Sequence, residues 1–179
     1  EGLSHESISI AGHLKLKKLI VLFDNNGISI DGKTSLTTSD NHIKRFQASN
    51  WNTIEIDGHN HLEIQNALKK SYSSEKPTII SCKTVIGYGS PNKQGSESCH
   101  GSPLGKNEAY LTKQKLGISY KPFSIPKNIL NEWRKIGKSG INKRLKWEKK
   151  LKSNKNKNSF LNQFSVISYS RNKEIIEFL

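Results

Sequence analysis

One continuous apolar run, and a second segment rich in Thr, Ile and Val, constrain the fold of this chain more than any other feature. The run Leu19–Phe23 ends at Asp24-Asn-Asn-Gly27, and the second segment, Thr78–Val85, follows Pro77. A shorter alternating segment, Asn52–Ile56, stops at Asp57-Gly58. Uninterrupted apolar runs are typical of strands that are buried on both faces of a parallel sheet. We therefore expect three strands within the first half of the chain.

Helical segments are expected before and between these strands. One helix is predicted to begin at Ser4, a second to run from Ser39 to about Ser49, and a third to begin near Asn60. Ser4 and Ser39 are expected to cap the first two helices, because a serine side-chain oxygen can accept a hydrogen bond from the first turn. The alternation of helices and strands, with short connections, predicts an α/β fold with a parallel sheet.

The last third of the chain has a different charge and a different pattern. The net charge is +14, of which residues 1–120 carry +3 (14 basic, 11 acidic) and residues 121–179 carry +11 (15 basic, 4 acidic). We predict that residues 121–179 form a basic, mostly helical extension, with a divergent tail from about residue 162. The helical spacing is seen in two apolar stripes: Ile129, Trp133 and Ile136, then Leu145, Trp147 and Leu151.

Two interpretations of the lysine-rich tail are open. Basic tails bind nucleic acid through phosphate contacts. Alternatively, the AT-rich codons of a biased genome favour Lys, Asn and Ile, as in the segment Lys152–Ser159. Only four of the 29 basic residues are arginine, which makes the stronger bidentate phosphate contacts. We therefore favour compositional bias and do not expect nucleic acid to be a partner.

Several classes of protein are excluded by simple counts. No apolar run approaches the roughly 20 residues that a membrane-spanning helix needs. The two cysteines, Cys82 and Cys99, are too few for a disulfide scaffold and lack a metal-ligand spacing. The chain contains no methionine and begins with Glu1, without a signal-peptide pattern, so we expect it to be a trimmed chain or a fragment.

The first unusual loop, Asp24–Gly32, follows the first predicted strand. In open α/β sheets, ligands bind beyond the carboxyl ends of the strands. The amide of Asn26 and carbonyls near Gly27 are neutral oxygen ligands, which suit Mg²⁺ together with phosphate oxygens. The alternative is a tight Asn-Gly hairpin turn in which the asparagines adopt left-handed conformations. Asp24 and Asp31 can also simply accept hydrogen bonds from loop amides.

The second unusual loop, Gly87–Gly105, follows the third predicted strand and is long for a compact domain, which suggests a functional loop. His100 in this loop can donate a hydrogen bond to an anionic oxygen or move a proton, or it can be an ordinary surface histidine. Cys99 is not expected to pair with it, because adjacent side chains usually point apart. The other histidines show no metal-binding spacing and are expected to be ordinary: His5, His13, His42, His59 and His61.

Taken together, these motifs resemble the transketolase family. The order and spacing match the second half of the family's N-terminal, thiamine diphosphate-binding domain, over about residues 1–150. The motifs that carry the resemblance are Glu1–Glu6, Leu14–Ile20, Asp24–Gly32, Ile56–His59, Cys82–Lys93 and His100–Gly105. The resemblance implies part of a doubly wound parallel sheet with a helical C-terminal extension, and residues 1–120 as part of the diphosphate-binding domain.

The resemblance also implies roles for individual residues. Asn26 and the backbone carbonyl of Ile28 correspond to ligands of Mg²⁺, and Asn26 also contacts the diphosphate of the cofactor. His100 corresponds to a histidine near the diphosphate and the reacting centre of the substrate, and Ile86 to an aliphatic residue against the thiazolium ring. Glu1 and Glu6 correspond to carboxylates at the interface of a homodimer. The family reaction is cytoplasmic and transfers a two-carbon ketol unit between sugar phosphates in the pentose phosphate pathway.

The chain departs from the family pattern in several places. The family's metal-binding aspartate lies in a Gly-Asp-Gly element upstream of Glu1, and the domain that supplies the activating glutamate is missing. Glu97 stands where the family has a histidine. We therefore expect the 179-residue chain to be inactive alone, unless a complementing chain supplies the missing parts. The competing interpretation is a non-enzymatic remnant, or a binding protein whose lysine-rich tail contacts nucleic acid.

Overall fold

A computed structural model describes residues 4–164 of the chain. The chain divides into two compact units, Glu1–Ser119 and Tyr120–Leu179, and each is described by itself. The first unit is built around a parallel sheet and contains both loops of interest. The second unit is helical over its described part.

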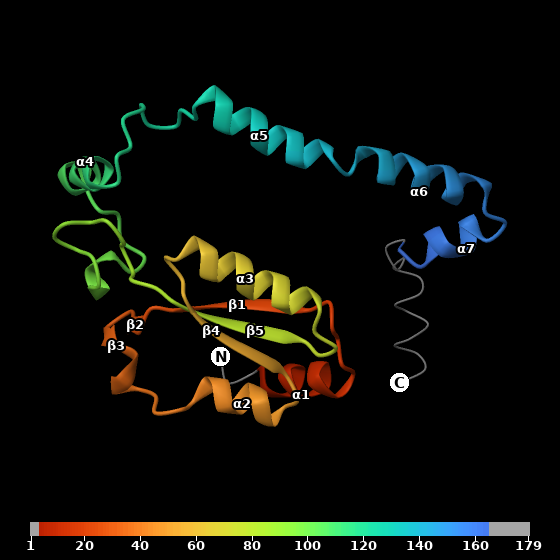
Figure 1. Ribbon diagram of the computed structural model, residues 1–179, viewed down its shortest axis with the longest axis horizontal. Coiled ribbons are helices and arrows are strands. Elements are labelled where there is room, and N and C mark those ends of the chain that lie inside the picture. Colours follow the sequence, from red (N-terminus) through yellow and green to blue (C-terminus); the bar gives the residue numbers. More distant parts are fainter. Residues whose placement is uncertain (1–3, 165–179) are drawn as a thin grey trace, which may run out of the picture. The chain divides into compact units, whose positions relative to one another are not determined.

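The sheet has three strands in the order β1 (Ile20–Asn25), β5 (Thr78–Lys83) and β4 (Asn52–Asp57), and all pairs are parallel (Figure 1). The last residues of β1 and β4 lie opposite the last residue of β5. All three strands therefore end at one edge of the sheet, and both unusual loops begin there. The expected α/β fold with a parallel sheet is confirmed.

The central strand β5 forms the core of this unit. Its first four residues are buried, and Ile80 is completely inaccessible. Ile79 packs with Ala11 and Trp51 in one cluster. Because neighbouring strand residues point to opposite faces, Ile80 faces the other side of the sheet, where α3 lies (Figure 1). The sheet is thus covered on both faces, as in a doubly wound fold.

Strand β1 is less buried than its apolar sequence predicts. It was expected to be buried on both faces, yet none of its residues is fully buried and Leu22 is 60% exposed. The reason is its position at the border of the described sheet, where β5 is its only neighbour. An apolar run therefore identified the strand correctly but not its degree of burial.

The described part of the first unit contains four α-helices: α1 (His5–His13), α2 (His42–Ala48), α3 (His61–Tyr72) and α4 (Lys106–Lys115). Helix α3 begins directly after Asn60, close to the expected start, and the side chain of Asn60 caps it by accepting hydrogen bonds from the N–H groups of Leu62 and Glu63. The prediction that Ser39 caps α2 is wrong, because Asn41 caps it instead. Ser4 precedes α1 but makes no capping hydrogen bond with its side chain.

Two short elements shape the loops that leave the sheet. A hairpin of β2 (Ile28–Ser29) and β3 (Gly32–Lys33) follows β1 and leads into a 3-10 turn, η2 (Thr34–Leu36). A second 3-10 turn, η3 (Glu97–Cys99), lies within the Gly-rich loop and ends directly before His100.

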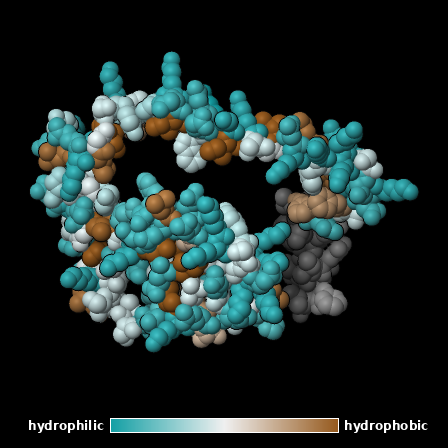
Figure 2. All heavy atoms as spheres, viewed as in Figure 1, coloured by the Kyte–Doolittle hydropathy of each residue, from teal (hydrophilic) through white to brown (hydrophobic). Residues whose placement is uncertain are grey.

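The second unit contains α5 (Lys127–Lys138), α6 (Ile141–Ser153) and α7 (Lys157–Asn162). Apolar side chains are interspersed with strongly hydrophilic ones along α5 and α6 (Figure 2). Phe160 of α7 makes edge-on contacts with Trp147 and Phe164. The expected divergent tail falls mostly after residue 164, outside the described residues.

Candidate functional site at the carboxyl edge of the sheet

Hydrogen bonds join the ends of the three strands, so the edge that carries the loops is a defined structure. The backbone N–H of Thr84 donates to the carbonyl of Asn25 at 3.4 Å, and its hydroxyl donates to the carboxylate of Asp24. On the other side, the N–H of Gly58 donates to the carbonyl of Lys83 at 2.8 Å. Residues that follow β1, β4 and β5 are therefore held close together.

The Asn26 loop is fixed by its own side chain and by a later turn. Asn26 Oδ1 accepts a hydrogen bond from the N–H of Ile28 at 2.9 Å, and both residues are half-buried. Gly27 has a φ of +71°, a conformation that favours glycine, and its carbonyl accepts the N–H of Thr34 at 2.9 Å. These contacts place the amide of Asn26 and the backbone of Ile28 in one compact turn.

The alternative interpretation of this loop as an Asn-Gly hairpin turn is wrong in its details. A hairpin does form, but it spans Ile28–Lys33, so its turn consists of Ile30 and Asp31. Neither Asn25 nor Asn26 is among the described residues with positive φ. Asn26 therefore lies between β1 and the hairpin, and its carboxamide shapes the connection.

The start of the second loop is anchored by a histidine from a different connection. His59, which follows β4, accepts a hydrogen bond from the N–H of Val85 at its Nε2 atom, 3.0 Å away. Its ring also stacks on the ring of Tyr88, with centroids 4.0 Å apart and planes 21° apart. The sequence interpretation treated His59 as an ordinary histidine and missed this role. Its position just after a strand end is the signal that would have found it.

A buried carboxylate from α4 anchors the next part of the loop. Glu108 accepts hydrogen bonds from the hydroxyl of Ser90 and from both the backbone N–H and the side-chain amide of Asn92, the latter two at 2.8 Å. These hydrogen bonds, the one from Ser90 most of all, lower the pKa of Glu108 to about 2. Sequence reasoning missed Glu108 as well, because nothing in the local pattern of α4 distinguishes it from a surface glutamate.

His100 lies beyond η3 with an exposed side chain. Its backbone N–H donates to the carbonyl of Glu97 at 2.8 Å, while its ring makes no hydrogen bond with residues 4–164. Ile86 is half-buried at the beginning of the same loop. Figure 1 shows this loop and the β2–β3 hairpin at the same end of the sheet. Within residues 4–164, His100 makes no direct hydrogen bond with the Asn26 loop.

Neither cysteine forms a nucleophile with a histidine. The Sγ atom of Cys99 points to the carbonyls of Ser96 (3.1 Å) and Lys93 (3.5 Å). Cys82 is half-buried in β5, and burial, together with the neighbouring charge of Asp24, raises the pKa of its thiol. A raised pKa disfavours the reactive thiolate. Thiol chemistry is therefore not part of this site.

The oxygen ligands available at this edge suit a hard cation that brings its own anionic partner. Residues 4–164 contain no group of three or more His, Cys, Asp or Glu side chains that could hold a metal ion. The amide of Asn26 and the backbone of Ile28 instead offer neutral oxygens. Mg²⁺ accepts such ligands when diphosphate oxygens complete its coordination. The chemistry of these residues thus fits a magnesium diphosphate, with additional ligands from elsewhere.

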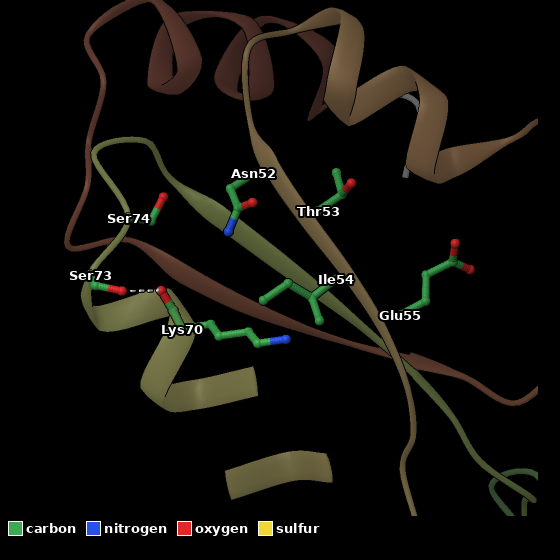
Figure 3. A pocket seen from close by; sticks show the side chains of 7 residues that line it. All are labelled: Asn52, Thr53, Ile54, Glu55, Lys70, Ser73 and Ser74. Carbon is green, nitrogen blue, oxygen red and sulfur yellow. Dashed lines mark hydrogen bonds between the residues drawn. The ribbon is translucent and has the colours of Figure 1, made fainter. Parts of the chain in front are cut away.

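A shallow hollow of about 580 Å³ lies beside β4, on a different part of the unit (Figure 3). Its lining comes from β4, from the last turn of α3 and from the residues that follow this helix: Asn52, Thr53, Ile54, Glu55, Lys70, Ser73 and Ser74. None of these residues belongs to the loops at the carboxyl edge. The hollow is therefore not part of the candidate site.

The remaining predicted site residues lie near the N-terminus. Glu6 is exposed in the first turn of α1, and Glu1 lies outside the described residues.

Within the described part of the chain, no helix is both long and apolar enough to cross a membrane.

The fold and the two anchored loops define a class: a parallel α/β domain, in which ligands generally bind at the carboxyl edge of the sheet. Comparison with known proteins identifies the family. The family model described as transketolase, thiamine diphosphate binding domain, matches residues 1–170. The chain belongs to this family, and the match extends beyond the region of about residues 1–150 on which the resemblance was based.

Individual transketolases agree with this assignment. The transketolase of Buchnera aphidicola subsp. Baizongia pistaciae is 48% identical over 159 residues, 88% of this chain and 24% of that protein. The crystal structure of Campylobacter jejuni transketolase matches with a TM-score of 0.83 and 32% identity, covering 96% of this chain and 27% of that chain. A Pichia stipitis transketolase in complex with sedoheptulose-7-phosphate matches with a TM-score of 0.79 and 30% identity, covering 90% and 24%. The chain thus spans about a quarter of the length of these relatives. The comparisons give no support to the nucleic-acid-binding alternative.

Proposed function

We propose that this chain is part of a transketolase, a thiamine diphosphate-dependent transferase. Its reaction would move a two-carbon ketol unit from a ketose phosphate to an aldose phosphate, in the cytoplasmic pentose phosphate pathway. The observation that carries this proposal is the family match over residues 1–170, combined with two anchored loops at the carboxyl edge of the sheet. The sedoheptulose-7-phosphate complex of the Pichia stipitis relative supports sugar phosphates as the substrate class.

Within this proposal, the residues of the two loops divide the work. Asn26 and the carbonyl of Ile28 would bind Mg²⁺, which neutralises the cofactor diphosphate. Ile86 would pack against the thiazolium ring, and His100 would donate a hydrogen bond to the diphosphate or to the substrate near its reacting carbon. When bound, thiamine diphosphate supplies the carbanion chemistry that breaks and forms the carbon–carbon bond. The exposed ring of His100 is compatible with contact to a ligand.

We also propose that the site requires polypeptide beyond the residues described above. The described residues offer Mg²⁺ neutral oxygens and no carboxylate cluster, so the other ligands would come from the cofactor diphosphate and from further polypeptide. Residues 1–120 would contribute part of the diphosphate-binding domain, and residues 121–179 a basic helical extension. Glu1 and Glu6 would lie at the interface of the homodimer in the intact enzyme.

An assay of ketol transfer tests the proposal. The chain is incubated with a ketose phosphate, an aldose phosphate, thiamine diphosphate and Mg²⁺, both alone and with a polypeptide that supplies the rest of a transketolase. We expect turnover only in the mixture, and its loss in the His100→Ala variant but not in the His61→Ala variant, a matched change at an exposed histidine. Turnover by the chain alone would contradict the need for a partner polypeptide. An inactive mixture of folded chains would contradict the proposed function.

A further inference from the structure

A buried acidic side chain of α4 holds the Ser90–Asn92 turn of the Gly-rich loop against that helix. Glu108 is only 8% exposed, and within residues 4–164 its carboxylate accepts hydrogen bonds from Ser90 and Asn92, both of which belong to the loop. A buried carboxylate without hydrogen-bond donors is costly, so the loop and the carboxylate stabilise each other's positions. Ser90 is itself completely inaccessible to solvent. The turn at Ser90–Asn92 is therefore a fixed point of the loop.

Lys93 connects this fixed turn to the rest of the loop. Its backbone N–H donates to Ser90 Oγ at 3.2 Å, and its Nζ atom donates to the carbonyl of Leu104 at 3.1 Å. Its own carbonyl accepts the N–H of Ser96 at 3.1 Å and the thiol of Cys99 at 3.5 Å. Lys93 thus contacts the loop on both sides of the segment that contains His100.

The thiol of Cys99 completes this connection. It packs beside Gly87, where an added Cβ would lie only 2.8 Å from the sulfur. The residue before His100 is thereby held against the beginning of the loop. A continuous series of contacts leads from Glu108 through Lys93 and Cys99 to the backbone of His100.

We propose that Glu108 is a positioning residue for His100. Glu108 acts without touching a ligand. Its carboxylate fixes the Ser90–Asn92 turn, and this turn is connected through Lys93 and Cys99 to His100. The inference deepens the proposed function, since it rests on His100 as a residue of the site. The proposal requires that the Gly-rich loop already adopts this conformation when no cofactor is bound.

The test compares Glu108→Ala and Glu108→Gln with the wild-type chain and with Glu55→Ala, which removes an exposed carboxylate from the same unit. Hydrogen exchange of residues 86–105 and the NMR signal of the His100 imidazole are measured without cofactor. In Glu108→Ala we expect the Asn92 amide to exchange roughly tenfold faster or more, and the His100 signal to move, while the amides of β5 keep their protection. Glu108→Gln should be intermediate, because its amide oxygen still accepts from Ser90 and Asn92. Glu55→Ala should match the wild type.

Two results would overturn the proposal: a His100 signal and loop exchange unchanged in Glu108→Ala, or loop and β5 exchange rising together, which indicates a global loss of stability. If Glu108→Ala does not fold, Glu108→Gln decides by the same two criteria. A titration with thiamine diphosphate and Mg²⁺ separates this inference from the proposed function. If the wild-type chain does not bind, but the exchange of residues 86–105 still rises in Glu108→Ala, the proposed function is refuted and the positioning role is supported. Equal binding by wild type and Glu108→Ala overturns the role of Glu108.

Discussion

The Nε2 atom of His59 accepts a hydrogen bond from the backbone N–H of Val85 at 3.0 Å, across 26 residues of sequence. This contact joins the connection after β4 to the connection after β5, and the stacking of His59 on Tyr88 reinforces it. Two loops that leave neighbouring strands therefore share one anchor. The anchor lies at the edge of the sheet where the ligand is expected.

Replacing His59 should loosen the start of the Gly-rich loop. His59→Ala leaves the N–H of Val85 without its acceptor and removes the stacked ring, so we expect a loss of about 1–2 kcal/mol in the free energy of unfolding. The amide of Val85 should exchange faster. Urea denaturation and hydrogen exchange measure the two effects. His61→Ala is the matched control, because His61 is exposed at the start of α3. Equal effects of both substitutions would show that His59 is no anchor.

Gly12 should tolerate no side chain. A Cβ at this position would lie 1.7 Å from the backbone oxygen of Ser49 and 3.2 Å from the ring of Trp51, in the core between α1 and the sheet. Because backbone has to move, we expect Gly12→Ala to lower the free energy of unfolding by about 3 kcal/mol. Thermal melting measures the loss.

A second glycine gives the control for this substitution. Gly137 lies inside α5, and a Cβ there would meet nothing within 4 Å. Gly137→Ala should therefore stabilise the helix by roughly 0.5–1 kcal/mol. Destabilisation of similar size in both variants would contradict the packing described for α1.

The anchor at Glu108 should weaken only in strong acid. Its pKa is lowered from an ordinary value of 4.5 to about 2 in the folded chain, mainly by the hydrogen bonds of Ser90 and Asn92. Because the pKa is lowered on folding, the ionised carboxylate of Glu108 stabilises the fold fully above about pH 4.5. This stabilisation is lost as the pH falls towards 2. The difference in melting temperature between wild type and Glu108→Gln should therefore shrink across that range. A difference that stays constant from neutral pH to about pH 2 would mean that the charge of Glu108 does not stabilise the loop.

The sequence predicted the elements that depend on local pattern. The three strands, their parallel pairing and the start of α3 near Asn60 follow from apolar segments and turn residues. It did not predict the exposure of Leu22, which depends on how many neighbours β1 has. It also missed His59 and Glu108, whose partners lie 26 and up to 18 residues away. The place of His59 after a strand end was a usable signal, whereas nothing in the local pattern of α4 marks Glu108. The proposed roles of Asn26 and His100 came from the family resemblance and remain predictions.

The central claim is that the Asn26 loop and the His100 loop share one magnesium diphosphate site. An NMR titration tests it most directly, with the side-chain amide of Asn26 and the imidazole of His100 observed together. We predict that thiamine diphosphate added with Mg²⁺ moves both signals along the same saturation curve, and that thiamine diphosphate alone moves them much less. Signals that respond independently, or do not respond at all in a folded chain, would contradict the claim.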